Sequence, residues 1–101
     1  MHLIQILLPL SDNDGRPFSG AAYGRVRHEM TERFGGITAF TRAPAEGVWK
    51  DENETSRDDV VVFEIMVADL DRSWWRAYRK DLEERFQQDT VAVRALPMET
   101  L

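Results

Sequence analysis

The stretch VVVFEIMV, residues Val60–Val67, decides the fold. Its β-branched and aromatic side chains favour a strand. Side chains alternate between the two faces of a strand, so one face is wholly apolar and holds Val61, Phe63, Ile65 and Val67. The opposite face carries Glu64 between Val62 and Met66. We therefore expect one face to meet a hydrophobic core and the other to be mixed.

Two helices are predicted, one before and one after this strand. The first covers residues 19–34, with Ser19 as its cap and Gly35 and Gly36 as its stop. The second begins after the capping residue Asp71 and extends to about residue 88. Each has an apolar stripe at helical spacing, made by Tyr23, Val26, Met30 and Phe34 in the first and by Trp75, Tyr78, Leu82 and Phe86 in the second.

Three further strands complete the pattern. They are predicted at residues 2–8, 37–42 and 90–96, and Pro97 ends the last of them. The resulting order is β-α-β-β-α-β. Its common compact solution is the α+β, ferredoxin-like arrangement, an antiparallel sheet in strand order 4-1-3-2 with both helices on one face.

Length and composition limit the range of functions. The 101 residues indicate a single domain, residues 1–101. The net charge of -5 argues against nucleic acid and anionic membranes as partners. The chain has no cysteine, which excludes disulfides and thiolate metal sites and fits a cytoplasmic protein. No window approaches the roughly 20 apolar residues of a membrane-spanning helix.

The face of the sheet away from the helices is expected to carry a large apolar patch. Alternation places Leu3, Leu7, Phe40, Val62 and Met66 on it. Soluble monomers seldom leave such a patch in water, so we expect a second copy of the chain to cover it. The prediction is a homodimer.

The same face carries the candidate site. Glu64 and Arg94 are the candidate catalytic residues, and with Gln5 they form a predicted row across three strands, with Arg42 beyond. The candidate substrate-binding residues are Gln5, Phe40, Arg42 and Trp49. The alternative is that Glu64 and Arg94 form an ion pair that fixes the sheet register or the dimer interface.

Other charged or glycine-containing segments have simpler interpretations. Two histidines, His2 and His28, lack metal-binding spacing, and His28 is expected in solvent; no metal or cofactor is predicted. Gly35 and Gly36 follow a helix, whereas phosphate-binding loops precede one. The acids Asp81, Glu83 and Glu84 interleave with the basic residues of the second helix, which predicts a solvated, ion-paired face. The basic residues are Arg72, Arg76, Arg79, Lys80 and Arg85.

The overall pattern resembles the dimeric α+β barrel proteins, in which two such sheets pack face to face. The segment from Phe34-Gly35-Gly36-Ile37-Thr38 to Gly47-Val48-Trp49 is also similar to small uncharacterised bacterial proteins of this fold. The resemblance implies a homodimer that can hold a small ligand between its sheets. We interpret the chain as a non-enzymatic, homodimeric domain of this kind that binds a small molecule. The alternative is a small metal-free enzyme, monooxygenase-like or isomerase-like, with Glu64 as base and Arg94 and Arg42 on an anionic group. A regulatory or partner-binding module, similar to small amino-acid-sensing domains, is the third possibility. Fold analogy does not choose among the three, because this topology hosts unrelated functions.

Overall fold

The computed structural model describes residues 1–36, the backbone of residues 38–42, and residues 60–101. Trp49, a candidate substrate-binding residue, lies outside these residues. The elements follow the predicted order: β1 (His2–Pro9), α1 (Gly20–Phe34), β2 (Thr38–Arg42), β3 (Val60–Val67), α2 (Arg72–Arg85) and β4 (Ala92–Pro97). The described residues thus form an α+β domain.

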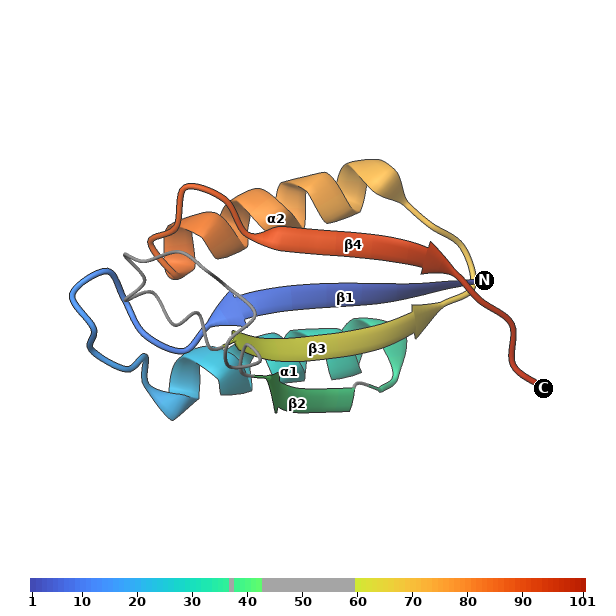
Figure 1. The fold of residues 1–101 in the computed structure, drawn as a ribbon. Helices are drawn as coiled ribbons and strands as arrows, with labels where there is room; N and C mark the ends of the chain where they lie inside the picture. Colours follow the sequence, from blue (N-terminus) through green and yellow to red (C-terminus); the bar gives the residue numbers. More distant parts are fainter. Residues whose placement is uncertain (37, 43–59) are drawn as a thin grey trace, which may run out of the picture.

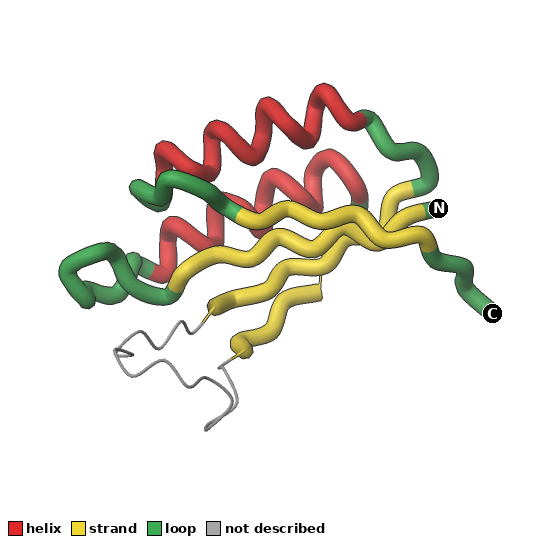
Figure 2. Tube along the Cα trace, turned by 45° about the horizontal axis from the view of Figure 1, so that its top comes forward, coloured by secondary structure: helices red, strands yellow, loops and turns green. Residues whose placement is uncertain are grey.

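The sheet in the described part of the chain has four antiparallel strands in the order β2-β3-β1-β4. This is the strand order predicted from the sequence. The two central strands pair along their whole length, from His2 opposite Val67 to Pro9 opposite Val60. Both helices lie on one side of the sheet, so the molecule has two layers and one open sheet face (Figures 1 and 2).

The core lies between the sheet and the helices. The predicted helix-facing residues of β1 and β3 are all buried, and so are the stripes of α2 and the centre of α1. The buried cluster consists of Ile4, Ile6, Leu8, Val26, Met30, Val61, Phe63, Ile65, Val67, Trp75, Tyr78, Leu82, Phe86 and Val91. Phe86 packs against Phe18 and Tyr23 with ring centroids 5.0 and 5.5 Å away. His28 is exposed, as predicted.

The helix ends follow the sequence signals with two differences. Asp71 caps α2 by accepting a hydrogen bond from the Trp74 backbone N–H at 3.1 Å, and Gly35 ends α1 with φ of 83°. Ser19 occupies the N-cap position of α1, but its side chain makes no capping hydrogen bond. The prediction that α2 reaches residue 88 was wrong, because the chain leaves the helix after Arg85 and Gln87 takes φ of 53°.

Glu29 on α1 connects the two helices. Its carboxylate accepts two hydrogen bonds from Arg85, both at 2.8 Å, and one from the Tyr78 hydroxyl at 2.7 Å. Partial burial raises the pKa of Glu29, but the hydrogen bonds from Arg85 and Tyr78 and the charges of Arg85 and Arg25 outweigh it, so the net pKa is lowered. Burial and the bond to Glu29 raise the pKa of Tyr78, which keeps the phenol protonated and donating.

Replacing Glu29 should therefore weaken the fold in a pH-dependent way. We expect Glu29→Gln to lower the free energy of unfolding by about 1–3 kcal/mol at neutral pH, because charged hydrogen bonds are lost. The folded-state pKa is depressed, so the contribution is present above the unfolded value of 4.5 and is lost as the pH falls through the lower folded value. Urea unfolding at several pH values measures it. Glu32→Gln, an exposed change of the same charge on the same helix, is the control; an equal loss there would contradict the role given to Glu29.

Candidate functional site

A polar row crosses the open face of the sheet. The strand registers place Thr38 of β2 opposite Glu64 of β3, Glu64 opposite Gln5 of β1, and Gln5 opposite Arg94 of β4. Three of these residues, Gln5, Glu64 and Arg94, are the row predicted from the sequence. The fold thus brings side chains from positions 5, 64 and 94 onto one line perpendicular to the strands.

Apolar rows lie on both sides of the polar row. One contains Met66, Leu3 and Leu96, and the other contains Val62, Leu7 and Ala92. Met66 is 56% exposed and Leu96 is 41% exposed, whereas Leu3 and Leu7 are half-buried. Val62 was predicted to lie in the exposed apolar patch that a second copy covers. It is instead fully buried, although it does not belong to the core cluster.

Gln5 holds Glu64 in place. The side-chain amide of Gln5 donates a hydrogen bond to Glu64 Oε2 at 2.8 Å, and both residues are half-buried. Gln5 also separates Glu64 from Arg94, since the two charged residues stand two strand spacings apart, about 10 Å. Within the described residues, Glu64 and Arg94 do not form an ion pair. The predicted direct pair is therefore replaced by a pair between Glu64 and Gln5.

The other predicted site residues are not gathered at this row. Arg42 lies opposite Val60, four positions along the strand from the Thr38–Glu64 pair, a separation of about 13 Å. Phe40 lies opposite Val62 and so belongs to the neighbouring apolar row by register. Trp49 lies outside the described residues. The structure therefore brings Gln5, Glu64 and Arg94 together and leaves Arg42 apart.

The row offers one acceptor and one cation at separate points. No described side chain donates a hydrogen bond to Oε1 of Glu64, and Arg94 is exposed. A carboxylate can accept hydrogen bonds from a cationic or hydroxyl group or take a proton, and a guanidinium can bind a carboxylate or phosphate. A ligand lying along the row could therefore contact both charges at once.

The described ranges contain neither a candidate metal centre nor a membrane-spanning helix. Residues 1–36 and 60–101 contain no group of three or more histidine or acidic side chains arranged to hold a metal ion. None of the helices in these ranges is long and apolar enough to cross a membrane. Glu29, Tyr78 and Arg85 form a titratable cluster that the sequence did not reveal, but its charges neutralise one another between the helices.

Comparison with known proteins bears on the fold. No protein-family model matches the chain, and no curated protein matches it in sequence. A solved structure does match: a phage SAM lyase in complex with S-methyl-5'-thioadenosine, with a TM-score of 0.60 and 17% sequence identity. The match covers 93% of this chain and 78% of the lyase chain. At this identity the likeness shows that the two proteins share a fold.

The geometry of the row predicts which side chains are energetically coupled. Because Glu64 and Arg94 do not touch, the effects of Glu64→Gln and Arg94→Met on unfolding free energy should add to within about 0.5 kcal/mol. Gln5→Leu and Glu64→Leu should instead show a coupling of about 0.5–1.5 kcal/mol, the usual net contribution of one hydrogen bond. Thermal or urea unfolding of the two cycles measures both quantities. A coupling between Glu64 and Arg94 as large as that between Gln5 and Glu64 would contradict this geometry.

Proposed function

We propose that this protein is a homodimer of the ferredoxin-like, dimeric α+β barrel type that binds a small molecule on the open face of its sheet. The observation that carries the proposal is the polar row between two apolar rows on that face. A face used only for packing would be stabilised by apolar residues throughout, whereas polar groups at the centre of an apolar surface give a ligand its orientation.

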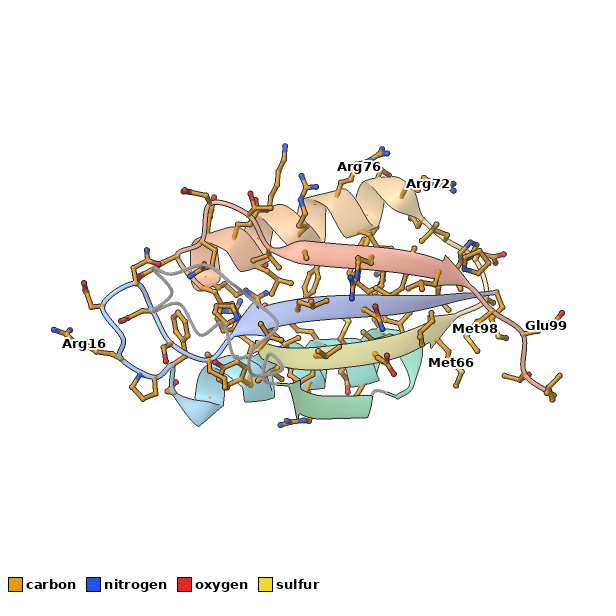
Figure 3. All side chains as sticks on the ribbon, in the orientation of Figure 1. Arg16, Met66, Arg72, Arg76, Met98 and Glu99 are labelled. Carbon is orange, nitrogen blue, oxygen red and sulfur yellow. The ribbon has the colours of Figure 1, made fainter. Side chains whose placement is uncertain are left out.

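The exposed apolar residues support self-association. Met66 and Leu96 lie at one end of the open face, in register with Leu3 between them, and are among the exposed large hydrophobic residues of the described chain. Figure 3 shows Met66 and Met98 at the end of the molecule where the C-terminal segment leaves the sheet. A second sheet packed there would remove this surface from water.

The charges of the row support a particular class of ligand. Glu64 offers a negative group and Arg94 a positive group about 10 Å apart between strands. A small zwitterion, with a cationic group for Glu64 and a carboxylate for Arg94, matches this spacing and sign. The structural neighbour suggests suitable probes: SAM carries a sulfonium, an ammonium and a carboxylate, whereas S-methyl-5'-thioadenosine lacks these charges.

An enzyme is the second candidate, because the structural neighbour is a lyase. In that case Glu64 is the general base, oriented by its hydrogen bond from Gln5, and Arg94 holds an anionic group of the substrate. Arg42 remains part of this proposal only for a substrate that extends along the strands, because its register position is distant from the row. Both proposed functions, ligand binding and catalysis, require Glu64. Replacing Glu64 therefore tests both, and only turnover of a substrate distinguishes the enzyme from the binding protein.

The assembly can be tested without knowledge of the ligand. We expect size-exclusion chromatography with light scattering to give a dimer, with an interface of about 1,600 Å² in total. Met66→Lys should shift the protein towards monomer, because a charge would be placed on the covered face. Ala77→Lys, at an exposed position of α2, is the matched control. A wild-type monomer at tens of micromolar would refute the dimer.

Ligand binding is tested with the two probes. We expect SAM to perturb the amide resonances of β1, β3 and β4, and S-methyl-5'-thioadenosine to bind more weakly. Glu64→Gln and Arg94→Met should each weaken SAM binding about tenfold or more, since each removes a charged contact. Asp89→Asn, an exposed carboxylate in the loop before β4, should leave it unchanged. Absence of SAM binding, or binding indifferent to Glu64, would refute this ligand class; conversion of SAM that Glu64→Gln abolishes would favour the enzyme.

A further inference from the structure

A hollow lies between α2 and β4, at one edge of the sheet. Its volume is about 180 Å³. Apolar residues from three elements and the loop before α2 form part of its wall: Ile4, Leu70, Trp75, Val93 and Ala95. The remaining lining residues are three arginines of α2, Arg72, Arg76 and Arg79, and Arg94 of β4, whose side chain alternation turns towards the open face. The site is therefore part apolar and strongly cationic in a chain whose net charge is -5.

The arginines of α2 fall into two groups. In the second half of the helix, Arg79 pairs with Glu83 at 3.5 Å, and Arg85 pairs with Glu29 and Asp81 at 2.8 and 2.7 Å. In the first half, Arg72 and Arg76 are exposed and form no ion pair with a described residue. The expectation that the whole basic face is neutralised by neighbouring acids was therefore wrong for Arg72 and Arg76.

The position of Arg72 is unfavourable for the helix itself. Arg72 is the first residue of α2, and the first turn contains no acidic residue. The helix dipole makes this end positive, so cations here are destabilising and anions are favoured. The adjacent carboxylate of Asp71 is engaged in capping, since it accepts from Ser73 Oγ and the Trp74 N–H. Residues that oppose local stability in this way are typical of functional sites.

Figure 3 shows how these two side chains lie. Arg72 and Arg76 extend on the same side of the first half of α2, and Arg16 lies at the opposite end of the molecule. Two guanidinium groups one helical turn apart can bind one anion together. The positive end of the helix adds to their attraction for it.

We infer that this hollow binds a phosphate monoester with a small apolar or aromatic body. A phosphate monoester carries about -1.5 to -2 charges at neutral pH, so it matches the two unneutralised guanidinium groups of Arg72 and Arg76 better than a single carboxylate would. The volume suits a small molecule, and the wall formed by Trp75, Val93 and Ile4 suits its apolar part. The inference is independent of the ligand proposed for the open face, on which alternation places the Arg94 side chain.

The test uses the full chain with phenyl phosphate, inorganic phosphate and phenol, at constant ionic strength maintained with chloride. We expect phenyl phosphate to shift the Trp75 indole resonance and raise the melting temperature, inorganic phosphate to do so more weakly, and phenol to have no effect. The double variant Arg72→Gln/Arg76→Gln should bind phenyl phosphate about tenfold more weakly or worse, because two charged contacts are lost. Without ligand, the same variant should melt at an equal or higher temperature than the wild type.

Arg16→Gln/Lys80→Gln is the matched control, because it removes the same charge from two exposed positions that do not line the hollow. It should retain wild-type affinity for phenyl phosphate. The inference is overturned if the wild type gives no response to either phosphate, or if both double variants lose binding equally. The single variant Arg76→Gln leaves the first residue of α2 unchanged and should show an intermediate loss of affinity for phenyl phosphate. It therefore separates the loss of charge from a structural change at the start of the helix.

Discussion

The antiparallel pairing of β1 with β3 is the constraint on which the rest of the structure depends. These strands occupy the centre of the sheet and pair over eight positions. With the pleat, this register turns Ile4, Ile6, Leu8 and the alternate residues of β3 towards the helices. The same register places Gln5 beside Glu64 on the other face. A slip of one residue would exchange the two faces, so burial of the core also fixes the polar row.

Alternation explains why so much of the fold could be predicted from the sequence. The period of two in β3 is uninterrupted, and the limits predicted for this strand, Val60 and Val67, are those of the structure. Prediction was weaker where no periodic signal exists. The end of α2 depends on the left-handed backbone of Gln87, a residue with no special preference for it. The contact between Glu29 and Arg85 joins residues 56 positions apart, and sequence spacing alone does not reveal such pairs.

The candidate site could be predicted only where the pairing of the strands that carry its residues could be predicted. Gln5, Glu64 and Arg94 were placed in one row because β1, β3 and β4 are neighbours in the predicted strand order. The position of Arg42 required the register between β2 and β3, which a long connection between two strands leaves undetermined. Arg94 and Glu64 are opposite in charge and on the same face, yet Gln5 between them prevents contact. Sequence can therefore indicate a shared face without indicating a pair.

The charges of α2 were predicted less well than its apolar stripe. The prediction treated the basic residues as one ion-paired face, but the acids of the helix, Asp81, Glu83 and Glu84, all follow Lys80. In the fold, Arg85 meets Glu29 from the other helix, and Glu83 both pairs with Arg79 and accepts from the Val91 N–H. The acidic residues thus neutralise arginines in the C-terminal half of α2, where the helix dipole already favours positive charge. Positive charge remains at the N-terminal half because no acidic residue of α2 lies three or four positions from Arg72 or Arg76, whereas Arg79 and Arg85 pair with Glu83 and Asp81 at that spacing.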